Sequence, residues 1–215
     1  YLAARAFTGT YGLFDMISLT FSEEGFSREN EVGYHMAALY PIVQQGYVYE
    51  AIGGTFFTPA VKRIFDAPLF FSVTQTLPDP LYEVAWARYR DSQYLRSIRA
   101  LRARKTPLSR TVLMEGTLVL PEDSCPERLT STVLDRAGKT ILRCGTVEDS
   151  RAVQISWGAP TWRGGKDFLN YLVYFRGIPL NTSICRIGYS YHLPALSYTT
   201  LAGNIPEVDG LVQTG

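Results

Sequence analysis

Histidine, cysteine and charged residues are scarce in this sequence of 215 residues. It has 2 histidines, 3 cysteines and 19% charged residues, whereas a globular protein typically carries about a quarter charged residues. Cys125, Cys144 and Cys185 lie far apart, in an odd number and without Cys-x-x-Cys spacing. The sequence therefore predicts neither a disulfide framework nor a zinc site, although it is compatible with a single disulfide.

Motifs for catalysis and cofactor binding are also missing. The spacing of His35 and His192 shows no Ser-His-Asp or Cys-His arrangement, and the Gly164-Gly165-Lys166 segment lacks the flanking residues of a phosphate-binding loop. We therefore expect no catalytic residue, no metal site and no cofactor. No run is long and apolar enough to cross a bilayer. The formal net charge of +1 gives the chain no general preference for nucleic acid or acidic membranes.

Aromatic residues and short alternating runs are abundant instead. Aromatics make up 13% of the chain, with 14 tyrosines and 11 phenylalanines. In residues 184–193 apolar and polar side chains alternate, which is typical of a strand covered on one face. Residues 171–175 are apolar on both faces, which is typical of a strand covered on both sides, or covered on one side and packed at an interface on the other. Gly177 and Pro179 are expected to end the strand at residues 171–175.

Further strands are expected along most of the chain. Residues 135–139, with Gly138, predict a hairpin between two of them. The expected strands are residues 13–21, 45–57, 69–77, 81–89, 111–120, 129–134, 140–144 and 152–157.

Helices are expected at three places. Apolar residues recur at helical spacing from residue 32 to residue 40, so a helix of about three turns is predicted to end before Pro41. Thr58 and Pro59 predict the start of a short helical turn that runs to Phe65. In residues 91–105 the apolar side chains recur every third residue, which predicts a short amphipathic helix with a basic face and with Asp91 or Ser92 as its cap.

These elements together predict a mainly β fold. About eight to ten short strands, with two or three short helices inserted, favour an antiparallel β-sandwich of the jelly-roll type. We expect a single domain over residues 1–215, with extended arms at about residues 1–12 and 194–215. A closed barrel of the lipocalin type is the alternative, although it would favour tighter hairpins than residues 22–46 and 90–110 offer.

Basic residues concentrate in one stretch of the chain, where a single acid, Asp91, accompanies them. Arginine and lysine neutralise phosphate charge without reading base sequence, so this stretch predicts contact with nucleic acid or with an acidic neighbouring subunit. A solvated helix face is the other interpretation. The residues are Arg88, Arg90, Arg96, Arg99, Arg102, Arg104, Lys105 and Arg110.

The leading hypothesis for function is a structural protein that assembles with itself. The expected strands, irregular insertions, low charge, C-terminal arm and a first residue other than Met are typical of a processed jelly-roll capsid subunit of a non-enveloped virus. The expected location is then the virion. The expected partners are copies of the chain, related subunits and packaged nucleic acid held through non-specific phosphate contacts, and the protein would not be an enzyme.

Two alternatives follow from the same sequence. Aromatic strands of a β-barrel would line a cavity for a small lipophilic ligand. A barrel enzyme would instead use His35 or His192 as a general base together with a distant acid.

Overall fold

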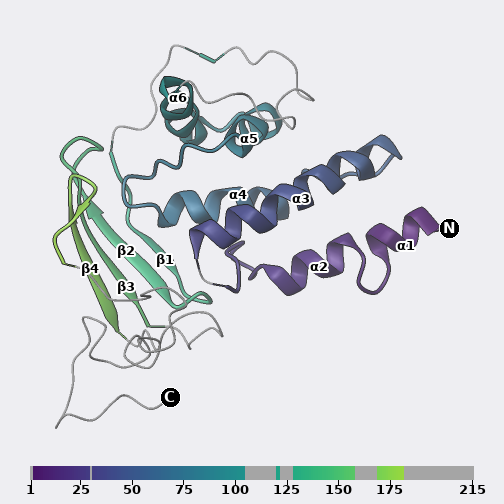
Figure 1. Cartoon of the computed structure of the whole chain (residues 1–215), viewed down its shortest axis with the longest axis horizontal. Helices are drawn as coiled ribbons and strands as arrows, with labels where there is room; N and C mark the ends of the chain where they lie inside the picture. Colours follow the sequence, from purple (N-terminus) through teal and green to yellow (C-terminus); the bar gives the residue numbers. More distant parts are fainter. Residues whose placement is uncertain (1, 30, 105–119, 122–127, 158–168, 182–215) are drawn as a thin grey trace, which may run out of the picture. The chain divides into compact units, whose positions relative to one another are not determined.

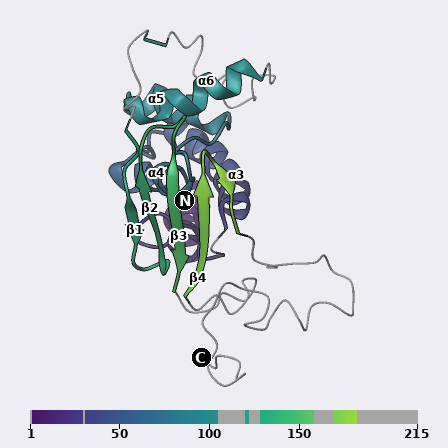
Figure 2. The same cartoon turned by 90° about the vertical axis from the view of Figure 1, so that its left-hand side faces the viewer.

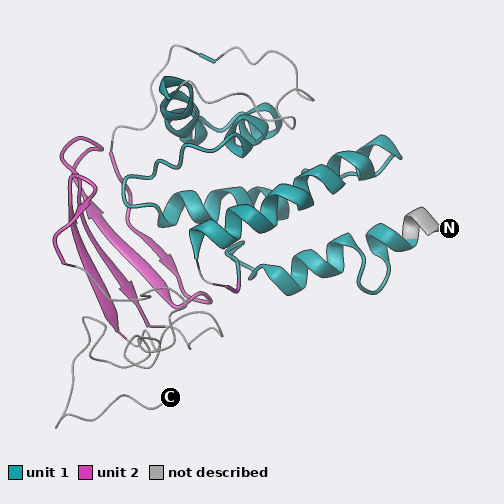
Figure 3. Cartoon of the chain, viewed as in Figure 1, with its two compact units in different colours: residues 1–27, 31–127 teal, residues 28–30, 128–215 magenta. Residues whose placement is uncertain are grey.

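The computed structural model describes residues 2–29, 31–104, 120–121, 128–157 and 169–181. The chain divides into two compact units, of which the first comprises residues 1–27 and 31–127 and the second residues 28–30 and 128–215 (Figure 3). The first unit is helical and the second contains a β-sheet (Figure 1). Helices account for more of the described residues than strands do. The prediction of a mainly β sandwich or jelly roll is therefore wrong.

The helical unit is a succession of helices in which each one packs against the next in sequence. Helix α3 packs on α2 and on α4, and α5 packs on α4, η1 and α6. The elements are α1 (Leu2–Thr8), α2 (Leu13–Thr20), α3 (Val32–Ala51), α4 (Pro59–Phe71), α5 (Leu81–Tyr89), the 3₁₀ helix η1 (Ser92–Tyr94) and α6 (Leu95–Ala103).

The strands expected at residues 13–21, 45–57, 69–77 and 81–89 are the main errors, because these segments contribute to α2, α3, α4 and α5. Short apolar runs do not distinguish a strand from a helix that is buried on several sides. In α5 all residues from Leu81 to Trp86 are buried, so no polar face marks the helical period.

Helix α3 also continues through Pro41, where a stop was expected. A proline inside a helix removes one hydrogen bond and costs about 3 kcal/mol. Burial of Leu39, Val43 and Tyr47 on both sides of Pro41 offsets this cost.

The predicted helix starts are confirmed in two places. Thr58 caps α4, because its Oγ1 accepts a hydrogen bond from the backbone N–H of Val61 at 3.4 Å. Asp91 caps η1 through a bond of 3.2 Å from the N–H of Gln93 to its Oδ1. The amphipathic pattern of α6 is confirmed as well, since its apolar residues Leu95, Ile98 and Leu101 are buried.

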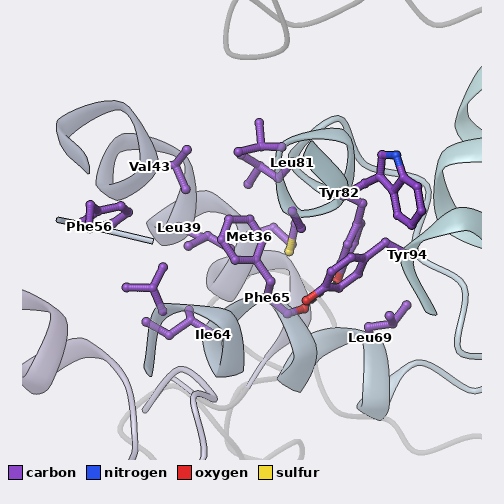
Figure 4. Packing of buried hydrophobic residues seen from close by; sticks show 14 of the residues in the cluster. Met36, Leu39, Val43, Phe56, Ile64, Phe65, Leu69, Leu81, Tyr82 and Tyr94 are labelled. Carbon is purple, nitrogen blue, oxygen red and sulfur yellow. Dashed lines mark hydrogen bonds between the residues drawn. The ribbon is translucent and has the colours of Figure 1, made fainter. Parts of the chain in front are cut away.

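The core of the helical unit lies between α3, α4 and α5. Figure 4 shows Met36, Leu39 and Val43 of α3 on the same core as Ile64 and Phe65 of α4 and Leu81 and Tyr82 of α5. Close approach at one point depends on glycine. A Cβ atom on Gly46 would lie 2.1 Å from Cδ1 of Phe56, which is itself completely buried. Helix α3 therefore contacts the segment before α4 through its bare backbone.

The second unit contains a five-stranded antiparallel sheet in which the strands follow one another in sequence order (Figure 2). Several predictions are confirmed here: the hairpin turns at Gly138, which has a φ of 60°, and strands overlap the expected residues 129–134, 140–144, 152–157 and 171–175. The strands are β1 (Thr132–Leu134), β2 (Lys139–Cys144), β3 (Arg151–Ser156), β4 (Asn170–Phe175) and β5 (Ile178–Pro179).

The turn between β4 and β5 is built from Arg176 and Gly177, which both have positive φ, of 50° and 75°. Two positive φ values are typical of the two-residue turns that suit the twist of a β-hairpin. Most of the strand expected at residues 111–120, the strand expected at 184–193 and the arm at 194–215 lie outside the described residues.

Candidate functional site

His35 of α3 holds the helical unit together from within. It is completely buried. Its Nδ1 accepts a hydrogen bond from the N–H of Ser27 at 3.1 Å, and its Nε2 lies 2.8 Å from the carbonyl oxygen of Ile64. The first bond requires an unprotonated Nδ1, so we assign the proton to Nε2, which donates to Ile64. The imidazole thus connects residue 27 to α4.

Burial lowers the pKa of His35 to about 4, although the bond to the Ile64 carbonyl opposes this shift. A general base needs a lone pair within reach of a substrate proton. Since both nitrogens of His35 are engaged inside the core, this arrangement does not suit the base of the enzyme alternative. His192, the other histidine of that alternative, lies outside the described residues.

A second set of polar side chains, some of them part-exposed, surrounds the buried Asp66 of α4. Its Oδ1 accepts hydrogen bonds from the Tyr94 hydroxyl and from Nε2 of Gln93, the latter at 2.8 Å. Its Oδ2 lies 2.9 Å from Nζ of Lys62, one helical turn earlier. Asp91 binds the same lysine at 2.8 Å and the same glutamine at 3.0 Å. We call these five residues the Asp66 cluster.

The protonation states in the Asp66 cluster follow from burial and pairing. Burial raises the pKa of the Asp66 carboxyl group, while Tyr94 and Lys62 act against this rise. Burial and the Asp66 carboxylate raise the pKa of Tyr94 far above its usual range. Burial lowers the pKa of Lys62, but its bonds to Asp91 and Asp66 outweigh that effect and the pKa is raised. Neither the phenol nor the ammonium group can therefore act as a base near neutral pH.

The role that the geometry gives to the Asp66 cluster is positional. Lys62 and Asp66 belong to α4, whereas Asp91, Gln93 and Tyr94 belong to η1 or precede it. The cluster therefore fixes the end of the α5–η1 connection on α4. Because α6 follows η1 directly, the cluster also sets the direction of α6 and thus the position of its arginines.

The predicted contact arginines are found on α5 and α6 of the helical unit. Arg88 is held on its own unit by an ion pair of 3.0 Å with Glu50. Its guanidinium lies 4.3 Å from the ring centre of Phe57 and 5.1 Å from that of Tyr47. These distances are within the range of cation–π contacts.

Three arginines of α6 also bind groups of the same unit. Arg102 pairs with Glu83 at 2.9 Å, and Glu83 is completely buried. Arg96 donates to the carbonyl oxygen of Thr74 at 3.2 Å, and Arg99 to that of Pro121 at 3.0 Å. These bonds give the three arginines a structural role within the helical unit.

The remaining arginines lie at the ends of these helices. Arg90 ends α5 in the left-handed conformation, with a φ of 54°, and its guanidinium lies 5.7 Å from the ring centre of Trp86. Arg104 follows α6 and is exposed. Lys105 and Arg110 lie outside the described residues. We call Arg88, Arg90, Arg96, Arg99, Arg102 and Arg104 the arginine set.

Groups suited to metal binding are not found in the part of the chain that the structure describes, where no three His, Cys, Asp or Glu side chains gather in a suitable way. Nor is any described helix both long and apolar enough to cross a membrane. The free thiol of Cys144 is exposed on β2.

Comparison with known proteins gives one similar fold. No family model and no curated protein matches the sequence. Among solved structures, the chain is similar to a heparan sulfate lyase HepC mutant from Pedobacter heparinus, with a TM-score of 0.53 and 18% identity. The likeness covers 88% of this chain and 30% of that chain.

This likeness shows the fold alone, because the identity is low. The chain spans less than a third of the lyase's length. Since the similar protein is an enzyme, the likeness gives no support to the expectation that this chain is not one.

The pH dependence of stability tests the role of His35. Its folded-state pKa of about 4 lies below the ordinary value of 6.5. The unfolded chain therefore binds more protons between these values, and stability falls as the pH falls through this window, by up to roughly 3 kcal/mol. We expect urea unfolding at several pH values to show this loss for the wild type and not for His35→Gln. Parallel losses in both proteins would contradict the assignment.

Removal of single hydroxyl groups tests the Asp66 cluster. Tyr94 and Tyr82 are both completely buried, with ring centres 5.7 Å apart. The Tyr94 hydroxyl donates to a carboxylate, whereas that of Tyr82 donates to the Phe65 carbonyl at 3.3 Å. We expect Tyr94→Phe to lower the free energy of unfolding by about 2 kcal/mol and Tyr82→Phe by about 1 kcal/mol. Both losses are measured by urea unfolding at pH 7. Equal losses would show that the bond of Tyr94 to the Asp66 carboxylate is no stronger than the bond of Tyr82 to a carbonyl group.

Proposed function

We propose that this chain belongs to a protein that acts on an acidic polysaccharide of the heparan sulfate class. The observation that carries the proposal is the fold similarity to a heparan sulfate lyase over 88% of the chain. Neither compact unit alone makes up that share of the chain. The likeness therefore draws on both the helical unit and the sheet unit.

The arginine set supports this proposal on physical grounds. Sulfate and carboxylate groups repeat along such a polysaccharide, much as phosphates repeat along a nucleic acid. Guanidinium groups bind these anions through paired hydrogen bonds, and the affinity falls as salt rises. The arginine stretch that the sequence relates to phosphate contacts would serve a sulfated polymer through the same interactions.

Within this function we assign binding to the arginine set, and we do not assign bond cleavage to His35, Tyr82 or Tyr94. A lyase removes the proton beside the uronate carboxyl group and expels the glycosidic oxygen, which leaves a double bond in the sugar. This step needs an accessible base. His35, Tyr82 and Tyr94 are completely buried. Burial also raises the pKa of Tyr82 well above its usual range, so none of the three fits that role.

The capsid hypothesis stays a prediction, but the jelly roll from which it was inferred is wrong. The comparisons with known proteins do not test self-assembly, packaged nucleic acid or a virion location. The lipophilic-ligand hypothesis required a closed barrel. The described sheet instead has two edges, at β1 and β5.

Binding of the intact chain to immobilised heparan sulfate tests the proposal. We expect binding that weakens with salt, and we expect the double variant Arg99→Gln/Arg104→Gln to bind about tenfold more weakly, which corresponds to about 1.4 kcal/mol. Both residues are exposed. Formation of the unsaturated sugar, followed by ultraviolet absorbance, shows whether cleavage accompanies binding.

The matched control is Arg5→Gln/Arg63→Gln, which removes the same charge from α1 and α4. Arg63 donates to the Glu23 carbonyl at 3.2 Å, much as Arg99 donates to that of Pro121. We expect the control to lose less than twofold in affinity. Absence of binding by the wild type would refute the proposed function. Equal losses in both variants would show that only overall charge matters.

A further inference from the structure

The sheet has one buried face, and its opposite face is more apolar than is usual for an antiparallel sheet. One face carries buried residues: Leu134, Lys139, Ile141, Arg143, Ala152 and Asn170. An antiparallel sheet with one buried face ordinarily presents polar side chains on the other. Here the register places mainly apolar residues on the opposite face, which we call the outer face. They are Val133, Leu142, Val153, Ile155, Tyr171, Val173, Phe175 and Ile178.

Several of these outer-face side chains are exposed. The exposed fractions are 50% for Leu142, 44% for Tyr171 and 38% for Phe175. An exposed apolar patch on a protein surface marks an interaction site more often than chance exposure does. The outer face, in which Thr140 is the polar residue between Val133 and Ile155, is therefore a candidate interaction surface.

Two aromatic rings mark a line across the outer face. Tyr171 and Phe175 share a face of β4 because they are separated by an even number of residues, and they lie roughly 13 Å apart along the strand. Val173 lies between them. The neighbouring strand β3 continues the same surface, since Ile155 pairs with Tyr171 and Val153 with Val173. The result is an apolar strip with a ring at each end.

Two arginines lie at one end of this strip. Arg151 is the cross-strand partner of Phe175, so both side chains lie on the outer face. The guanidinium of Arg176 lies 5.1 Å from the ring centre of Phe175. Both arginine side chains are well exposed, at 64% and 60%, and they share one carboxylate, Asp149, at 3.1 and 3.6 Å. Two guanidinium groups therefore lie at this end of the strip, next to the acidic residues Glu148 and Asp149 of the β2–β3 loop.

We propose that this strip is a binding surface for the acidic polysaccharide of the proposed function, on which the inference rests. The apolar C–H face of a sugar ring packs on an aromatic ring. A sulfate or carboxylate group on the same or the next sugar pairs with a guanidinium. We call Tyr171, Val173, Phe175, Arg151 and Arg176 the outer strip. It adds a contact on the sheet unit to the arginine set of the helical unit.

The size of the outer face favours a narrow ligand over a second protein. Three strands of six residues, β2, β3 and β4, and the shorter strands β1 and β5 cover roughly 360 Å². A stable protein interface buries about 800 Å² on each partner. The strip is narrower still, and two guanidinium groups lie at one of its ends. A sugar chain fits both features.

Affinity for heparan sulfate, measured by calorimetry on the intact chain, tests the outer strip. We expect Tyr171→Ala/Phe175→Ala to bind about tenfold more weakly than the wild type, with an unchanged melting temperature because both side chains are part-exposed. Tyr171→Phe keeps the ring and should retain the affinity. The matched control Val133→Ala/Leu142→Ala removes exposed apolar groups from the same face, outside the strip, and should lose less than twofold.

Charge is tested separately with Arg151→Gln/Arg176→Gln, which we expect to fold normally because both side chains are exposed. We expect weaker binding and a shallower dependence of affinity on salt, since fewer ionic contacts form. If the wild type binds and these variants bind equally well, the inference is overturned while the proposed function stands. If the wild type does not bind, both fail. A dimer that the aromatic variants dissociate, with unchanged sugar affinity, would show a protein contact and overturn the inference.

Discussion

Burial of the Asp66 carboxyl group is the constraint on which the arrangement of the later helices depends. A carboxylate inside a protein costs several kcal/mol unless donors and a counter-charge surround it. Asp66 receives these from Lys62 on its own helix and from Tyr94 and Gln93 in η1. Helix α4 therefore cannot be buried in its present position unless η1 lies against it. Because α6 follows η1 directly, the same contacts determine where its arginines lie.

Polar contacts and the apolar core stabilise the helical unit in different ways. Residues such as Leu39, Phe65 and Leu81 provide most of the burial, which is not directional. His35 and the Asp66 cluster instead join particular atoms of segments far apart in sequence. Each leaves a buried polar group without a partner if the segments shift. The core thus favours compactness, while these bonds select one packing of the helices.

Local sequence predicted some elements well and others poorly, for physical reasons. The cap at Thr58, the period of Leu95, Ile98 and Leu101 and the hairpin at Gly138 are signals that a few neighbouring residues supply. The runs at 45–57 and 81–89 are helical although they resemble strands, because burial on several sides removes the polar face that reveals a helical period. Only part of the candidate site could be predicted from the sequence. The four-residue spacing of Lys62 and Asp66 is visible, but Tyr94 is 28 residues from Asp66 and reaches it only through the packing of α5.

The arginines also show what could not be predicted from the sequence. Their concentration is plain in the sequence, but their partners are not. Glu50 and Glu83 belong to other helices, and the Thr74 and Pro121 carbonyl groups are backbone atoms. The sequence shows that residues 171–175 are apolar on both faces, but only the register of β2, β3 and β4 shows that the neighbouring strands continue the apolar outer face. The two surfaces belong to different units, and each is suited to anionic or sugar groups by its own chemistry.

Amide hydrogen exchange, with and without a sulfated oligosaccharide, tests the central claim most directly, because it reports both surfaces in one experiment. The account predicts slower exchange in β3, β4 and α6 when the sugar is bound, and unchanged exchange in α2, which carries no residue of either surface. Slower exchange confined to α6 would restrict the contact to the arginines. Unchanged exchange throughout, at sugar concentrations that saturate a known heparan sulfate-binding control protein, would contradict the account.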